Sequence, residues 1–311
     1  MTACGSAAQV AAPENLIPAG ANLIAQIQVS QLPQDPDFAT LYDQAPKSSG
    51  DPQSFQELLD MAQEETGIDF RQFNSAILFG DISRDDEYFG VIAQGQVDQE
   101  QFISAIQEQS EHTFTSIDYK GRQIHLSQDE EDAPALSFLD DTMLVIGTLP
   151  AVQAVIDVQE GDQPRVSGKV YDTFMGLGDP LFSMALSVPP EALTELEDSL
   201  GEAEGFGMMP AMTAFRDLDI VSLVVDKPGS ELKMEAQLDF FTTESATKMG
   251  NTLDGFLKLA AGFASNEQTG KMMEKLQLDV NGTRLTLKFQ APISELKEVS
   301  RSMEEDFGGQ N

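Results

Sequence analysis

Side chains that could perform acid–base or nucleophilic chemistry are scarce in this chain. Its 311 residues include two histidines, His112 and His125, and one cysteine, Cys4. A hydrolytic triad needs a nucleophile, a base and an orienting acid within reach of one another. His112 follows an acidic residue in a polar stretch, which is typical of a solvated side chain. His125 lies in the alternating stretch 117–126, which is typical of the solvent side of a strand. The histidines therefore predict no catalytic base.

Motifs that form catalytic or phosphate-binding loops do not occur in the sequence. It contains no G-x-S-x-G elbow and no G-x-x-x-x-G-K-[ST] phosphate loop. The glycine-rich stretch 176–180 has a different spacing and predicts a turn. We therefore expect no nucleotide and no other cofactor.

Carboxylates are the one reactive group present in excess. Stretches 81–87 and 129–132 are dense in Asp and Glu, but neither follows the ligand spacing of a calcium loop. Zinc is disfavoured because its usual Cys and His ligands hardly occur. Two carboxylates can hydrolyse a glycosidic bond, but any single pair is uninformative among 52 acidic residues. We predict no resident metal, and a carboxylate- or calcium-dependent hydrolase stays open as an alternative.

The charge balance excludes two classes of partner. The chain has 52 acidic and 18 basic residues, and its net charge is −34. Nucleic-acid phosphates and anionic lipid headgroups are bound through Lys and Arg. We therefore expect no nucleic-acid partner and no electrostatic binding to a membrane surface. Solubility and a saline habitat both remain as explanations of the acidity.

The single cysteine lies next to the start of the sequence. It cannot form an intramolecular disulfide. Residues 2–6 (TACGS) resemble the lipidation site of bacterial envelope lipoproteins. The resemblance implies a lipid on Cys4, a membrane anchor and an extracytoplasmic position in the bacterial cell envelope, with residues 1–18 as a tether. The charged and apolar parts of a secretion signal are not in this sequence, and a free cysteine without a role is the alternative.

The two halves of the sequence share one order of expected elements, which predicts an internal duplication. The first repeat, 19–163, contains a strand, a helix, a strand pair, a helix, two hairpins and a helix. They are predicted at 22–30, 54–67, 70–83 with 88–97, 98–106, 117–126, 135–148 and 150–156. The second repeat, 164–311, lacks a counterpart of 135–148. Its elements are predicted at 180–188, 189–201, 215–226, 231–240, 246–263, 276–289 and 292–303.

Local signals support several of these boundaries. Ser54 and Glu57 form a capping box at the start of a helix. The pair Asn281-Gly282 is a strong hairpin signal. A proline opens the last helix of each repeat, at Pro150 and Pro292.

The strand patterns predict the fold class. Alternation at Leu23, Ala25 and Ile27, and again at Phe89 and Val91, predicts strands that bury one face only. Amphipathic helices must then cover that face. We predict an α+β fold, two tandem pseudo-repeats of antiparallel β-hairpins layered with amphipathic helices. The two sheets could stay separate or join into one.

Methionines are unevenly distributed and mark a candidate site in the second repeat. Methionine is flexible and polarizable, which suits an adaptable apolar cavity or groove, although it also fills ordinary cores. The predicted ligand-binding residues are Phe206, Met208, Met209, Met212, Phe256, Phe263, Met272 and Met273.

Together these features favour a binding protein. We predict a non-enzymatic, lipid-anchored cell-envelope protein that binds a partner protein or a hydrophobic, lipid-like ligand. A structural subunit of an envelope complex is a further alternative.

Overall fold

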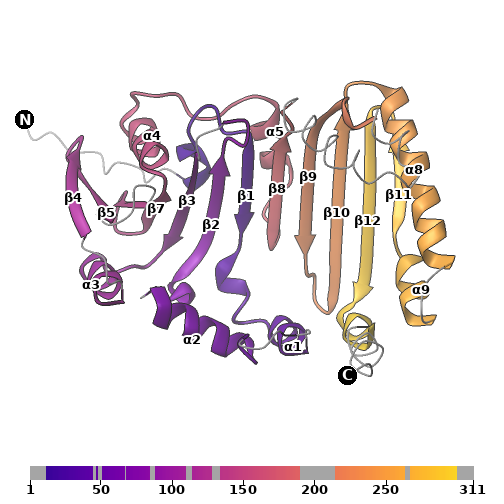
Figure 1. Ribbon diagram of the computed structural model, residues 1–311, viewed down its shortest axis with the longest axis horizontal. Helices are drawn as coiled ribbons and strands as arrows, with labels where there is room; N and C mark the ends of the chain where they lie inside the picture. Colours follow the sequence, from indigo (N-terminus) through magenta and orange to yellow (C-terminus); the bar gives the residue numbers. More distant parts are fainter. Residues whose placement is uncertain are drawn as a thin grey trace, which may run out of the picture.

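The centre of the molecule is one open antiparallel sheet. The computed structural model describes residues 12–44, 47, 51–66, 68–84, 88–109, 114–127, 134–189, 214–262 and 267–299. Within these residues the sheet has 12 strands in the order β11-β12-β10-β9-β8-β1-β2-β3-β7-β6-β5-β4 (Figure 1). The predicted α+β class is confirmed.

The strands are numbered along the chain. Their bounds are β1 Leu23–Ile27, β2 Phe73–Gly80, β3 Phe89–Gly95, β4 Phe114–Tyr119, β5 Arg122–Ser127, β6 Ala135–Phe138, β7 Met143–Gly147, β8 Phe182–Ser187, β9 Leu218–Asp226, β10 Glu231–Phe240, β11 Gln277–Asn281 and β12 Arg284–Pro292.

Helices and short 3-10 turns connect the strands. Their bounds are η1 Pro13–Leu16, η2 Val29–Gln31, α1 Pro36–Gln44, α2 Phe55–Thr66, η3 Phe70–Gln72, α3 Gln99–Gln109, α4 Leu149–Glu160, α5 Lys169–Gly176, α8 Thr243–Gly262 and α9 Glu267–Met273. Residues 293–299 form a further helical segment after β12.

The two predicted repeats contribute adjacent parts of this sheet. Strand β1 pairs with β2 on one side and with β8 on the other, so the sheet is continuous across the sequence boundary. From this seam the order β1-β2-β3 runs outward one way and β8-β9-β10 the other way. Strand β12 lies beside β10 as β7 lies beside β3. In this arrangement β12 and β11 occupy the positions of β7 and β6. The hairpin without a counterpart in the second half is therefore β4–β5, and not the expected 135–148.

One side of the sheet, which we call the α4 face, carries the main core. Ile24, Ile77 and Ile92 are almost fully buried on this side. They pack in one cluster with side chains of η1, α4 and α5. The sequence pattern had placed the buried side of β1 and β3 on the other set of alternating residues. That expectation is incomplete for these strands: Ala25 and Ala93 of the expected set are buried, but Ile24 and Ile92 on the α4 face are buried more fully, at 0% exposed, so both sides are apolar.

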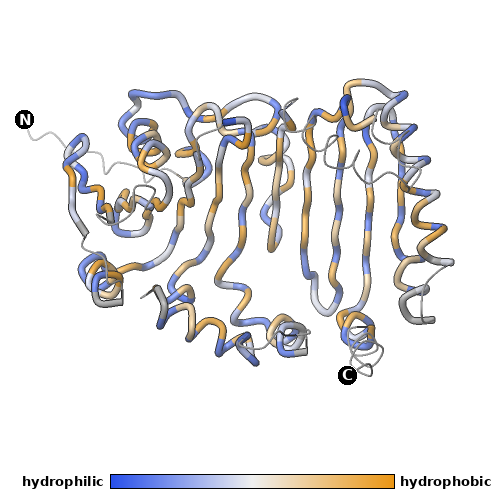
Figure 2. Tube along the Cα trace, in the orientation of Figure 1, coloured by the Kyte–Doolittle hydropathy of each residue, from blue (hydrophilic) through white to orange (hydrophobic). Residues whose placement is uncertain are grey.

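The opposite side, which we call the α8 face, is apolar in both halves. Helix α3 covers one end of it through Phe102, which clusters with Ala93 and Leu144. Helix α8 covers the other end, where Ala246 and Met249 pack with Leu285. Strands β10 and β12 are polar on their α4 face, with Glu235 opposite Lys288, so their apolar residues all point to the α8 face. Figure 2 shows apolar residues along both halves of the sheet.

Candidate functional site

A row of apolar side chains crosses the α8 face from strand to strand. Each member lies directly opposite the next in the pairing register, so the side chains point to the same side. The row runs Leu136, Ile146, Val91, Leu78, Ala25, Met184, Leu223, Ala236, Leu287 and Leu278. No polar residue interrupts it between β6 and β11.

The middle of this row is only partly buried. Leu78 is 36% exposed, and Val91, Met184 and Leu223 are half-buried. A second row beside it consists of Ile27, Phe182, Val225, Met234 and Phe289. Met234 is 38% exposed. Contiguous exposed apolar surface is uncommon on soluble proteins and marks interaction sites.

The dimensions of the two rows suit an elongated molecule. Neighbouring strands are about 4.8 Å apart, so the path from β3 to β12 across this face is roughly 30 Å long. Helices α3 and α8 stand at its two ends. We call the two rows between these helices the apolar floor.

A polar pair lies beyond the α3 end of the apolar floor. Leu136 is opposite His125, and His125 is opposite Ser116. The Ser116 hydroxyl oxygen lies 3.0 Å from Nδ1 of His125. Burial lowers the pKa of His125 below its usual value. A groove of about 470 Å³ adjoins His125 between Glu100, Ile103 and Phe138.

This pair does not form a triad with the groups around it. In the described part of the chain, no carboxylate is hydrogen-bonded to His125, so the imidazole has no orienting acid. The pair therefore offers a polar hydrogen-bonding position beside an apolar surface.

The charged residues near the other end of the floor lie on the opposite side of the sheet. Met234 and Phe289 contribute to a groove of about 830 Å³. Lys233, Glu235 and Lys288 contribute to the same groove. These three side chains alternate with Met234 and Phe289 along β10 and β12 and point to the α4 face. Of the polar groups described above, the Ser116–His125 pair is the one on the same side of the sheet as the floor.

Ion pairs hold helix α1 at the lower ends of the strands in Figure 1. The Lys227 ammonium, in the β9–β10 turn, lies 2.6 Å from Asp35 and 3.0 Å from Asp37. Lys297, in the segment 293–299, lies 3.0 Å from Asp37. Hydrogen bonds from Lys227 and Lys297 hold the pKa of Asp37 below its usual value. These contacts connect the first half of the chain with the second.

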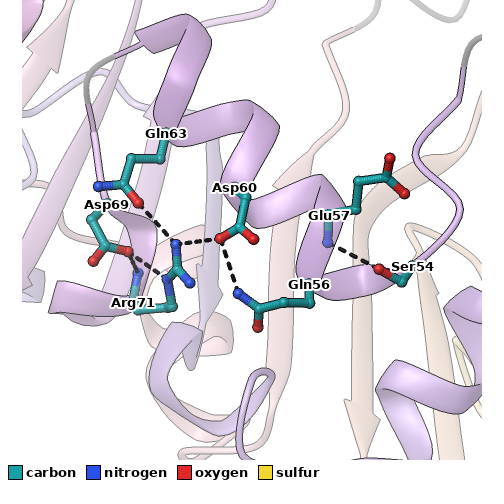
Figure 3. Close-up of polar contacts among 7 residues, drawn as sticks. All are labelled: Ser54, Gln56, Glu57, Asp60, Gln63, Asp69 and Arg71. Atoms are coloured by element: carbon teal, nitrogen blue, oxygen red, sulfur yellow. Dashed lines mark hydrogen bonds and ion pairs between the residues drawn. The ribbon is translucent and has the colours of Figure 1, made fainter.

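Helix α2 is attached by a separate network that centres on Arg71 (Figure 3). The Arg71 guanidinium contacts Asp69 at 2.7 Å and Asp60 at 3.0 Å. It also donates to the amide oxygen of Gln63 at 2.9 Å. The hydrogen bond to Asp69 raises the pKa of Arg71. Helices α1 and α2 run along the lower ends of the strands in Figure 1.

The predicted ligand-binding residues fall into two groups. Those at 206, 208, 209, 212 and 263, and also Cys4, lie outside the described residues. Phe256 is 57% exposed on α8, and Met272 and Met273 are half-buried on α9. Met272 borders a groove of about 530 Å³ with Lys275. Their role in ligand binding stays a prediction.

Metal-binding clusters and membrane-spanning helices are both absent from the described residues. In the described ranges, no group of three or more His, Cys, Asp or Glu side chains is arranged to hold a metal ion. None of the described helices combines the length and apolar composition that crossing a membrane requires.

The similarity of this chain to known proteins is a similarity of fold. No protein-family model matches the chain, and no curated protein sequence does. Solved structures of the protein TP0453 are similar in fold. Its crystal form III aligns with 94% of this chain and 98% of that chain, at 11% identity and a TM-score of 0.53. Crystal form IV aligns with 93% and 96%, at 11% identity and a TM-score of 0.51.

Most residues of the apolar floor were not predicted from the sequence. Ala25, Ile27 and Val91 were predicted as members of alternating strands, but the joining of β1 to β8 was left open. The floor exists only because this junction aligns residues from both halves in one register. A usable signal was that β2 and β3 are apolar at both odd and even positions, which indicates strands with two apolar faces.

Proposed function

We propose that this chain is a non-enzymatic, lipid-anchored cell-envelope protein that binds an elongated hydrophobic ligand on the apolar floor. The observation that carries the proposal is the partial exposure of an apolar row that continues through both halves of the sheet. Ligand sites are mostly apolar concave surfaces with a few polar groups that fix orientation. The floor supplies the apolar part, and the Ser116–His125 pair supplies polar groups beyond its α3 end.

Binding is tested with the full chain and an apolar fluorescent probe, N-phenyl-1-naphthylamine. The wild-type protein is expected to enhance the fluorescence of the probe saturably. Met234→Glu places a carboxylate on the floor, where desolvating it is costly, and should weaken probe binding by about tenfold or more.

The matched control for this variant is Met175→Glu. Met175 is 47% exposed on α5, away from the α8 face, so its replacement should leave probe binding unchanged. Absence of a saturable signal from the wild-type chain, or equal weakening by both variants, would contradict the proposal. Thermal melting of each variant checks that the fold is intact.

The lipid anchor is tested separately by mass spectrometry of the protein purified from its own membranes. The resemblance of residues 2–6 to a lipidation site supports this part of the proposal. We expect a covalent diacyl or triacyl mass on Cys4, and Cys4→Ser should release the protein from the membrane fraction. An unmodified Cys4 would remove the anchor from the proposal and leave the floor to be judged by the probe titration.

A further inference from the structure

The two edges of the sheet are constructed differently. Strand β11, at one edge, is overlaid by helix α8 (Figure 1). The approach is so close that a Cβ on Gly250 would lie 2.5 Å from Cγ2 of Val280. Strand β4, at the other edge, pairs with β5 along one side only in the described part of the chain. An unpaired edge strand presents free N–H and C=O groups that can template another strand.

Strand β4 has few of the devices that usually block such pairing, and its one charged residue is Asp118. Its sequence, FTSIDY, contains no proline, lysine or arginine. Its register with β5 is regular over all of its residues, without a bulge. Ile117 is 36% exposed, and its neighbours Ser116 and Asp118 are exposed. The edge is therefore straight, accessible and partly apolar.

The turn that joins β4 to β5 determines which backbone groups face outward. Lys120 and Gly121 form a two-residue turn with positive φ values of 53° and 78°. In such a hairpin, Tyr119 and Arg122 form the hydrogen-bonded pair that closes the turn. Ile117 therefore bonds to β5 through its backbone. Ser116 and Asp118, which alternate with it, direct their N–H and C=O groups away from the sheet.

The outer strand is also held in place. The Tyr119 hydroxyl donates to Asp157 at 2.9 Å, and the Lys120 ammonium lies 2.5 Å from Asp157 and 2.6 Å from Asp162. Asp157 belongs to α4, which is part of the main core. An edge fixed in this way has less conformational entropy to lose when another strand pairs with it.

We propose that β4 is a homodimerisation edge, where it pairs antiparallel with β4 of a second copy of this chain around a two-fold axis at Ile117. Ile117 then faces Ile117 of the second copy, at a non-hydrogen-bonded position where Cα atoms are about 4.5 Å apart. Ser116 faces Asp118 of the second copy, so a hydroxyl meets a carboxylate. This edge and its partner differ from the apolar floor and its ligand, although Ser116 also belongs to the polar pair beyond the α3 end of the floor.

A second copy fits this edge because the edge is self-complementary. A two-fold interface requires that each residue and its counterpart be compatible in both directions. The pairs Ile117 with Ile117 and Ser116 with Asp118 meet this requirement, and they place no two like charges directly opposite each other. Thr115 then faces Tyr119 of the second copy, which completes the strand pair.

The net charge of the chain gives this association a definite salt dependence. Each copy carries a net charge of −34, so two copies repel each other at long range. Salt screens this repulsion, because the Debye length is only about 10 Å at 0.1 M ionic strength. The dimer should therefore become tighter as sodium chloride is added, which is the opposite of what ion-paired interfaces show.

The proposal is tested by sedimentation velocity of the full chain over a range of concentrations, at low and high salt. The wild-type protein is expected to form a reversible dimer that is favoured by salt. Ile117→Lys brings two ammonium groups face to face and should raise the dissociation constant about tenfold or more. Ile82→Lys is the matched control, because Ile82 is 45% exposed outside the strands, and it should leave the dimer unchanged.

A second variant tests the backbone pairing directly. Ser116→Pro removes an outward N–H but no hydrogen bond to β5, so it should abolish the dimer while circular dichroism stays unchanged. A wild-type chain that is monomeric at all concentrations and salt levels would overturn the proposal. Equal weakening by Ile117→Lys and Ile82→Lys would also overturn it, because association would then not depend on β4.

Discussion

Lys227 and Asp37 join the two halves of the chain at the end of the sheet: the Lys227 ammonium lies 3.0 Å from a carboxylate oxygen of Asp37. The side chain of Lys227 is only 8% exposed and also contacts Asp35. The core clusters of the described residues contain no residue of α1 or α2. The position of α1 relative to the second half therefore depends strongly on these ion pairs.

Replacing this lysine should loosen α1 and lower stability moderately. Lys227→Met keeps an apolar stem but leaves Asp35 and Asp37 without their shared cation. We expect a loss of about 1 kcal/mol, which corresponds to a decrease in Tm of roughly 2–4 °C for a domain of this size class. Lys288→Met is the control, since Lys288 is 56% exposed and 3.3 Å from Glu235, and its Tm should stay at the wild-type value. Equal decreases would contradict a special role for Lys227.

The same network predicts a specific acid sensitivity. Hydrogen bonds from Lys227 and Lys297 lower the pKa of Asp37. A carboxyl group with a lowered folded-state pKa stabilises the fold above its unfolded pKa, which is about 3.9, and this contribution is lost as the pH falls through the lowered pKa. The Tm difference between wild type and Asp37→Asn should thus be constant from pH 7 to about pH 5 and shrink below about pH 4. A difference that stays constant at acid pH would exclude Asp37 as the titrating group.

Two glycines in α8 should respond to the same substitution with opposite sign. A Cβ at Gly250 would collide with Val280, whereas a Cβ at Gly255 would meet no atom within 4 Å. Gly250→Ala should destabilise the protein by about 1–3 kcal/mol because the packed contact with β11 cannot relax freely. Gly255→Ala should stabilise it by about 0.5–1 kcal/mol through helix propensity. Denaturant unfolding of both variants measures the two values, and the same sign for both would refute the packing of α8 on β11.

Arg71 should control the local opening of α2. Its guanidinium reaches Asp69, Asp60 and Gln63 together, which the single ammonium of lysine cannot do. In Arg71→Lys, amide hydrogen exchange within α2 should become about two- to fivefold faster, while exchange in β2 and β3 stays unchanged. Uniformly faster exchange would indicate a global effect, and unchanged exchange in α2 would show that other contacts hold the helix.

Local signals in the sequence predicted most of the elements. The helix start at Ser54 is as expected: the Ser54 hydroxyl accepts from the Glu57 amide at 3.1 Å, while the Glu57 carboxylate accepts from the backbone N–H of Gln53 at 2.7 Å instead of that of Ser54. The predicted helix 54–67 corresponds to α2. The hairpin signal at Asn281-Gly282 also located a real turn. Its central residues are Gly282 and Thr283, because Asn281 is still paired with Arg284. Such features depend on neighbouring residues, which is why a single sequence reveals them.

Features that depend on distant residues were not predictable in the same way. Helix α1 was missed, although Phe38 and Tyr42 have helical spacing, because its contacts with Lys227 and Lys297 come from the far end of the chain. The second buried side of β1 was missed because Ala25 and Ile24 are both apolar, and the packing of α4 and α5 on Ile24 comes from distant parts of the chain. The apolar floor depends on the β1–β8 junction, which no local pattern encodes.

That junction also determines the order in which the chain can complete its fold during synthesis. Ile27 pairs with Phe182, so β1 leaves the ribosome long before its partner β8 is made. Domains begin to fold from their N-terminal end as they emerge. Until Phe182–Ser187 has emerged, the nascent first half therefore presents β1 as an unpaired edge that another chain could pair with. The strand at the middle of the finished sheet is therefore an open edge, like β4, while the chain is being made.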